Sequence, residues 1–368
     1  MQYWSVADYL RGCHAEPKVK HLANVAQILR FAQNDLHHLA CVRAGVSEGD
    51  FTERLNMKII FLFAVSLLVV MVVPAVAQND IRIITEENAV SVQIGKDSIL
   101  RYCYRSVPFK PYVQQLFTPS GVNVLRDAPA DHLHHHALMF AVAVDGVNFW
   151  EEQQAPGRQE HRSFADTKID RRDGLPVAVF TELIDWVNPR GKELLLNESR
   201  TIEVCRLAEP AVTLLTWWSK FEVPAGKEFV ALTGSPYFGL GMRFLQSMDT
   251  GGQFCNADGK TGVQETNDKQ ATWCAYSAGA DVKTVTIAMF DFPGNERHPA
   301  TWFTMDNPFA YLSATLGLHK EPLKITAGKP LVVRYGVALW DGQVQPEQID
   351  KLYKQWAGWR LQSEKVKN

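Results

Sequence analysis

The chain has 368 residues, and its 38 basic and 40 acidic side chains give a formal net charge of −2. Proteins that bind nucleic acid or anionic membranes neutralise phosphates with an excess of lysine and arginine. The near-balance of charge therefore argues against a nucleic-acid partner.

An export signal is predicted over residues 57–77. Met57-Lys58 is followed by an apolar run over 59–73 and by Ala75-Val76-Ala77, which are the parts of a cleavable secretory signal peptide. The run is shorter than the roughly 20 apolar residues that a membrane span requires. We expect cleavage after Ala77, no stable membrane span afterwards, and a periplasmic or extracellular protein; a signal anchor is the alternative.

Residues 1–56 are interpreted as a spurious or disordered extension. An export signal functions near the translated N-terminus, so Met57 is the expected first residue. The remaining chain, 78–368, has a length that suits one large all-β domain.

Alternation of apolar and polar residues with a period of two dominates the chain after residue 78. It predicts strands at 89–94, 98–102, 137–144, 176–187, 199–207, 211–223, 283–290 and 331–340. One helical pattern follows Pro346, where Ile349, Leu352, Tyr353 and Trp356 share one face. We therefore predict a large antiparallel β-sandwich with a C-terminal helix.

Four cysteines fall in the predicted exported part: Cys103, Cys205, Cys255 and Cys274. Export permits disulfides, and Cys255 with Cys274 is the local pair that the spacing favours. Buried free thiols are the alternative.

The segment Asp131-His132-Leu133-His134-His135-His136 carries four of the eleven histidines. Imidazoles bind metal ions, move protons near neutral pH and form hydrogen bonds with hydroxyl groups. In a strand, His132, His134 and His136 would share one face and could ligate a divalent metal. A solvated loop and a sugar-contacting segment without metal are the alternatives.

Carboxylates follow a tryptophan a short distance downstream, in Phe149-Trp150-Glu151-Glu152. An indole face can stack on a pyranose ring, and a carboxylate can accept hydroxyl hydrogens or move protons. Adjacent strand residues point to opposite faces, so only one glutamate is expected to enter a site, and Glu151 is our candidate. A core tryptophan with solvated glutamates is the alternative.

Three further candidates stand apart from these segments. Arg243 lies among apolar neighbours, where a half-buried guanidinium needs an anionic or carbonyl partner such as a substrate oxygen. His298 precedes a proline that restricts its backbone, which suits a fixed ligand or base. His161 is a weaker candidate, and ordinary surface or loop roles are the alternatives for all three.

The chain resembles an exported family that carries the label methane oxygenase PmoA-like. The resemblance rests on Asp131-His132-x-His134-His135-His136, on Asp145-Gly146-x-Asn148-Phe149-Trp150-Glu151-Glu152, on His298-Pro299 with Trp302, and on Asn307-Pro308-Phe309. Leu133 replaces the usual proline, and His136 stands where arginine is common. The label describes an integral membrane subunit, and beyond 59–73 this chain has no apolar run of spanning length. The resemblance instead implies a galactose-mutarotase-like supersandwich in a carbohydrate setting.

We therefore expect a carbohydrate-processing enzyme, an epimerase, lyase or hydrolase acting on a sugar or glycoside. The expected catalytic residues are His132, His134, His135, Glu151 and His298, and the expected substrate-binding residues are Asp131, His136, Trp150, His161 and Arg243. A divalent metal on His132, His134 and His135 is the open cofactor hypothesis. The alternatives are a non-catalytic carbohydrate-binding module and a metal-dependent oxidoreductase.

Overall fold

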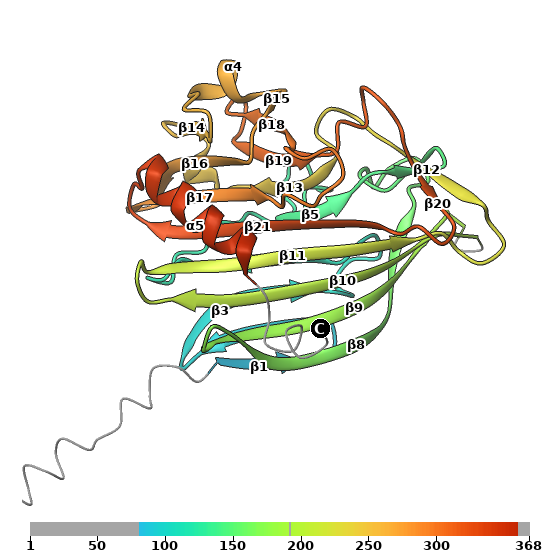
Figure 1. The fold of residues 1–368 in the computed structure, drawn as a ribbon, viewed down its shortest axis with the longest axis horizontal. Coiled ribbons are helices and arrows are strands. Elements are labelled where there is room, and N and C mark those ends of the chain that lie inside the picture. Colours follow the sequence, from blue (N-terminus) through green and yellow to red (C-terminus); the bar gives the residue numbers. More distant parts are fainter. Residues whose placement is uncertain (1–80, 191–192, 360–368) are drawn as a thin grey trace, which may run out of the picture. The chain divides into compact units, whose positions relative to one another are not determined.

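The computed structural model describes residues 81–190 and 193–359. They form two large antiparallel sheets and one small sheet (Figure 1). The nine-stranded sheet has the order β1 (Ile81–Thr85), β2 (Ala89–Ile94), β3 (Asp97–Cys103), β4 (Tyr112–Leu116), β5 (Leu138–Ala141), β13 (Gly239–Arg243), β19 (Tyr311–Thr315), β18 (Thr301–Met305) and β15 (Lys269–Gln270).

The eight-stranded sheet has the order β14 (Gln253–Asn256), β16 (Trp273–Ala280), β17 (Lys283–Asp291), β21 (Leu331–Asp341), β11 (Val212–Glu222), β10 (Leu194–Leu207), β9 (Leu175–Val187) and β8 (Arg158–Arg172). The small sheet has the order β20 (Leu323–Thr326), β12 (Phe229–Thr233), β6 (Ala143–Val144) and β7 (Val147–Asn148). The helical elements are η1 (Gln246–Met248), α4 (Gly262–Thr266) and α5 (Pro346–Gly358).

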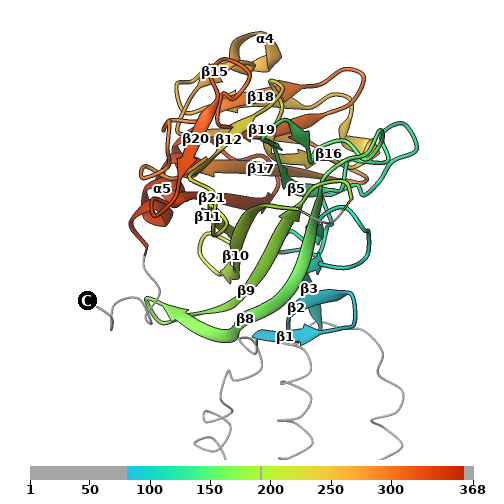
Figure 2. The same cartoon turned by 90° about the vertical axis from the view of Figure 1, so that its right-hand side faces the viewer.

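The core lies between the two large sheets because alternate residues of both point inward. Tyr102 of β3 meets Phe180 of β9 with ring centroids 5.3 Å apart, and Phe140 of β5 meets Trp186 of β9 at 6.4 Å. β1 also contacts β8 and β9, so the sheets approach one another at that end (Figure 2). Apolar burial across this interface is the main stabilising contribution.

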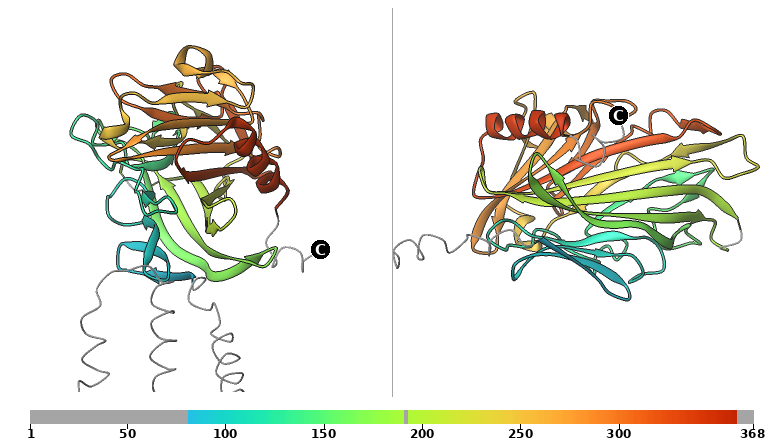
Figure 3. Two further views of the ribbon diagram at one scale, coloured as in Figure 1. Left: turned by 90° about the vertical axis from the view of Figure 1, so that its left-hand side faces the viewer. Right: turned by 60° about the horizontal axis from the view of Figure 1, so that its bottom comes forward.

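A second apolar layer covers the outer face of the eight-stranded sheet. The helix α5 packs its buried side chains, Ile349, Leu352, Tyr353 and Trp356, against this face (Figure 3). The indole of Trp356 also donates a hydrogen bond of 2.9 Å to Thr216 Oγ1 of β11. The predicted C-terminal helix and all-β sandwich are thus confirmed.

Three local predictions differ from the structure. The predicted strand 137–144 is divided into β5 and β6. The long strand β8 escaped prediction because most of its side chains are polar and solvated, which leaves little apolar alternation to detect.

The proposed pair Cys255 and Cys274 is not a disulfide, and the four described cysteines are free thiols. Cys255 pairs with Ala275 and Asn256 pairs with Cys274 in the ladder between β14 and β16. Paired residues share a face of a sheet and neighbours alternate, so the two thiols point to opposite faces.

The predicted extension 1–56 and signal peptide 57–77 lie outside the described residues, and the single domain over 78–368 stays a prediction. Across residues 81–190 and 193–359, no helix combines the length and the apolar character that crossing a bilayer requires.

Candidate functional site

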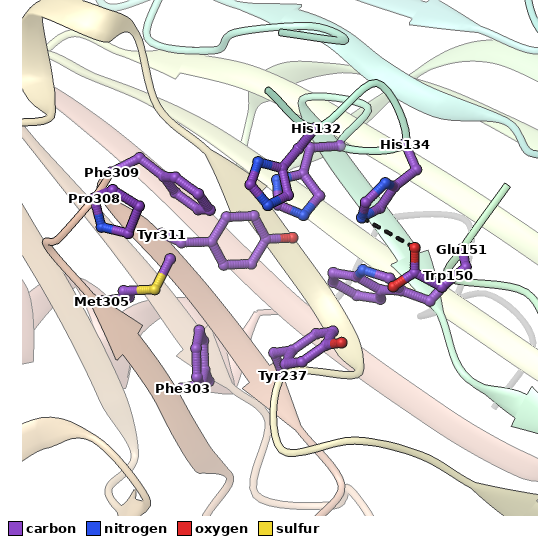
Figure 4. Close-up of a pocket in the computed structure, with 11 residues that line it drawn as sticks. His132, His134, Trp150, Glu151, Tyr237, Phe303, Met305, Pro308, Phe309 and Tyr311 are labelled. Atoms are coloured by element: carbon purple, nitrogen blue, oxygen red, sulfur yellow. Dashed lines mark ion pairs between the residues drawn. The ribbon is translucent and has the colours of Figure 1, made fainter. Parts of the chain in front are cut away.

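A cavity of about 350 Å³ brings together the two segments that the sequence singled out. Figure 4 shows histidines on one side, aromatic side chains below them, and the Glu151 carboxylate next to His134. The lining residues are His132, His134, His135, Trp150, Glu151, Tyr237, Phe303, Met305, Pro308, Phe309 and Tyr311.

The floor of the cavity is the outer face of the nine-stranded sheet. Phe303 and Met305 of β18 alternate with the buried Trp302 and Thr304, and Met305 pairs with Tyr311 of β19. Paired residues of antiparallel strands share a face, so all three lining residues point away from the inner core. Strand alternation therefore supplies an apolar floor without disturbing the core.

The histidines lie on a turn between β4 and β5, so the structure has the loop that the sequence left open rather than a strand. The His132 amide bonds to Pro129 O, and the His135 amide bonds to His132 O at 3.0 Å. This turn brings His132, His134 and His135 together and leaves Leu133 exposed. The imidazoles of His132 and His135 stack with their centroids 4.6 Å apart.

No metal-binding geometry accompanies this clustering. Within the described part of the chain, no three histidine, cysteine, aspartate or glutamate side chains are arranged to hold a metal ion. The metal hypothesis for His132, His134 and His135 therefore gains no support from the geometry.

His134 and Glu151 are two ionisable side chains of the cavity lining that contact one another. His134 Nε2 lies 3.4 Å from Glu151 Oε2 (Figure 4). Burial lowers the pKa of His134, while the charge of Glu151 acts in the opposite direction. The imidazole is consequently neutral at neutral pH and able to accept a proton.

His135 is held neutral more strongly than His134. Burial, with the neighbouring His134 and His132, lowers its pKa to about 2. Its Nδ1 has no hydrogen-bond partner in the protein, and the same is true of Trp150 Nε1 and the Tyr311 hydroxyl. Buried polar groups normally have a partner, so these three atoms are candidates for contact with a bound polar molecule.

The Trp150 indole is placed differently from the expected stacking wall. It is fully buried and stacks on Phe238, with centroids 5.2 Å apart and planes 10° apart. This face is covered by protein. Tyr237, Phe303 and Met305 are partly exposed apolar residues of the cavity lining.

His136 lies behind the cavity, in a polar network. Its Nδ1 bonds to Asp127 at 2.9 Å and its Nε2 lies 3.0 Å from Glu152. Burial opposes the charged form, but the two carboxylates raise the pKa of His136; the imidazole in turn helps to lower the pKa values of Asp127 and Glu152. Lys110 Nζ completes the network, 2.9 Å from Glu152 and 2.7 Å from Trp150 O.

Arg243 and Asp131 form an ion pair beside the cavity rather than in its lining. Their closest atoms are 3.1 Å apart, and the guanidinium lies 3.4 Å from the ring centroid of Phe309. Asp131 Oδ2 also accepts a hydrogen bond of 3.0 Å from His132 Nδ1. Although burial acts against it, this bond and the charge of Arg243 lower the pKa of Asp131 to about 2.

His298 and His161 are not among the residues that line this cavity, so the expectation that His298 shares it with the 131–136 segment is wrong. His298 Nδ1 lies 2.6 Å from Asp291, at the end of β17. His161 Nδ1 lies 2.7 Å from the buried Glu182. Each imidazole has its own buried carboxylate, which explains both histidines as parts of local polar clusters.

Sequence reasoning missed most of the aromatic lining. Tyr237, Phe303 and Tyr311 lie in or next to apolar strands, where an aromatic residue normally indicates core. Gly241 was also missed: a Cβ there would overlap the Tyr311 hydroxyl and lie 2.9 Å from Trp150 Cη2. The spacing Gly239-Leu240-Gly241 was the available signal, because glycine inside a strand often marks a close approach.

A family model described as "Family of unknown function (DUF6807)" matches residues 89–354. The chain belongs to the DUF6807 family. No curated protein matches it.

The solved structures that match this DUF6807 protein are remote from it. The GH36 α-galactosidase AgaA from Geobacillus stearothermophilus is 10% identical, with 72% of this chain and 41% of that chain covered and a TM-score of 0.36. A putative mutarotase from Salmonella typhimurium is 9% identical (71% and 97% covered, TM-score 0.30). A galactose mutarotase related enzyme from Lactobacillus acidophilus is 9% identical (72% and 97%, TM-score 0.32). The chain thus spans about two fifths of the α-galactosidase.

The His136 network of this DUF6807 protein should produce a pH-dependent contribution to stability. We expect His136→Gln to lower the free energy of unfolding by about 3 kcal/mol, because two largely buried carboxylates lose their shared cation. Because folding raises the pKa of His136, the stabilisation that its charge provides is complete below the unfolded-state pKa of about 6.5. This stabilisation is lost as the pH rises through the pKa of the folded state. Because folding lowers the pKa values of Asp127 and Glu152, the stabilisation from these carboxylates is complete above roughly pH 4.5 and is lost at more acidic pH.

Urea unfolding of parent and variant should accordingly differ most at about pH 5 to 6. A difference that keeps growing toward alkaline pH would contradict this account of the network.

Gly241 should be required by the packing of the cavity floor. We expect Gly241→Ala to cost about 1–3 kcal/mol, because the new methyl group displaces Tyr311 and Trp150. Gly279→Ala in β16 is the matched control, since a Cβ there meets no atom within 4 Å, and it should change stability by less than about 0.5 kcal/mol. Equal effects of the two substitutions in urea unfolding would show that the floor is not closely packed.

Proposed function

We propose that this protein is an exported carbohydrate-processing enzyme that transfers protons on a sugar or glycoside bound in the cavity. The observation that carries the proposal is the combination of an aromatic surface with the facing pair His134 and Glu151. Sugars need both, because their C–H faces pack on aromatic rings while their hydroxyls require polar partners.

The size and lining of the cavity favour one ring-sized polar unit. Its volume of about 350 Å³ lies near the lower end of small-molecule sites, which run from about 300 to 1,000 Å³. Tyr237, Phe303 and Met305 supply apolar contact, and the imidazoles supply hydrogen bonds. A neutral His135 offers either a donor or an acceptor to a hydroxyl, which suits an uncharged substrate.

The ionisable groups favour an epimerase or lyase over a hydrolase. Hydrolysis of a glycosidic bond usually needs two carboxylates flanking the bond. Among the described residues that line the cavity, Glu151 is the one carboxylate, and it is accompanied by three imidazoles. A single carboxylate with histidines suits removal and return of a proton.

In the proposed mechanism, His134 accepts a proton from the substrate, and the Glu151 carboxylate stabilises the imidazolium that forms. His132 is oriented by its Nδ1 hydrogen bond to Asp131, which Arg243 holds in place, so its Nε2 is left for a substrate hydroxyl. Arg243 therefore acts as a positioning residue. His298 has no part in this mechanism, and a cofactor is not assigned.

The proposal of export rests on the signal-peptide pattern of residues 57–77. The PmoA-like resemblance contributes only the motifs whose residues line the cavity. The binding-module alternative keeps the same cavity without proton transfer.

The proposal is tested by isothermal titration and proton NMR of the protein with glucose, galactose, xylose and their disaccharides. We expect binding and slow chemical change of at least one sugar. Glu151→Gln should lower kcat/KM by about 10²- to 10⁴-fold. Because Glu151 raises the pKa of His134, its loss should move the acidic limb of the pH–rate profile to lower pH.

Glu222→Gln is the matched control, because Glu222 is an exposed carboxylate at the end of β11. It should leave both the rate and the pH profile unchanged. Sugar binding without any turnover by the parent would support the binding module, and the absence of both would refute a carbohydrate function.

A further inference from the structure

A second cavity, of about 400 Å³, adjoins the first, and Glu151 lines both. It is lined by β7 and the turn before it, by the segment that follows β7, and by Pro189 in the turn after β9. Its polar side chains are Asn148, Gln153 and Gln154, together with Glu151. We call it the amide groove.

The amide groove differs chemically from the first cavity. Among its described lining residues there is no aromatic side chain and no imidazole. Side-chain amides each offer donors and an acceptor without charge, which suits hydroxyl groups. The groove thus fits a neutral, hydrophilic group that is held by hydrogen bonds rather than by stacking.

Asn148 connects the two cavities structurally. Its Oδ1 accepts hydrogen bonds from the amides of Trp150 at 2.7 Å and Glu151 at 3.2 Å. The amide oxygen is therefore committed to the backbone, and Nδ2 is the group left for a ligand. The same turn that fixes Glu151 at the first cavity thereby orients a donor of the groove.

We propose that the amide groove is a subsite for a second sugar unit or another hydrophilic substituent of the substrate. The inference rests on the proposed function and specifies it: the substrate is an oligosaccharide or a glycoside with a polar substituent, rather than a free monosaccharide. One ring occupies the aromatic cavity, the next unit occupies the groove, and Glu151 lies at the junction between them.

The test compares a disaccharide with its own monosaccharide, using cellobiose with glucose, lactose with galactose, and xylobiose with xylose. Gln153→Ala combined with Gln154→Gly removes two groove amides and spares Asn148, whose substitution would also move Glu151. Glycine suits position 154 because its φ is 58°. Gln343→Ala is the matched control, since Gln343 is an exposed glutamine far along the chain, outside the groove lining.

We expect the parent to bind one disaccharide at least tenfold more tightly than its monosaccharide. The double variant should lose about tenfold in affinity for the disaccharide and keep its affinity for the monosaccharide, while Gln343→Ala changes neither. Monosaccharide binding with no gain from the second unit, or equal losses for both ligands, would overturn the subsite alone. A parent that binds no saccharide would instead overturn the proposed function on which the subsite depends.

Discussion

The site depends on the imidazolium of His136, which bridges Asp127 and Glu152 behind the cavity wall. Each of its partners belongs to a different segment, one preceding the histidine turn and the other following β7. Glu151 is one residue before Glu152, and His135 is one residue before His136, so the bridge positions the outward side chains through the backbone. Side chains that contact a ligand keep a fixed position only when residues behind them, here His136 and its carboxylates, hold them in place.

Lys110 extends the same constraint to Trp150. Its ammonium group bonds to the Trp150 carbonyl while it pairs with Glu152, and burial lowers its pKa despite that partner. A lysine so deeply buried is costly without its carboxylate, so the charges of the network depend on one another. The aromatic and histidine lining of the cavity thus lies in front of a compact set of charged side chains.

Much of the fold, and about half of the site, could be predicted from the sequence. Apolar alternation identified strands such as Leu331–Asp341 and the helix Pro346–Gly358 because their buried faces are continuous. The histidine turn and Glu151 were found because polar, ionisable residues gathered at one place are unusual. Phe303 and Tyr311 could not be separated from core residues, since a strand sequence does not say which of its two faces meets the other sheet.

The misplaced residues have a common physical origin. In the sequence, His298 and His161 could not be distinguished from the histidines of the site. In the structure His298 contacts the buried Asp291 and His161 contacts the buried Glu182, and the sequence does not identify these pairs. For residues 131–136 the sequence left a strand and a loop open, and backbone hydrogen bonds within the segment close it into a turn. Tertiary partners thus account for the two histidines, and local hydrogen bonds account for the turn.

The two outer faces of the sandwich differ, because one is covered by a helix and the other forms the cavity. The helix α5 seals the outside of the eight-stranded sheet, whereas turns and loops leave the outside of the nine-stranded sheet hollowed. Residues such as Phe303 and Met305 belong to the hollow, while their neighbours Trp302 and Thr304 belong to the interior. Substitutions at every second position of β18 can therefore reshape the cavity while the buried residues between them keep the interior packing unchanged.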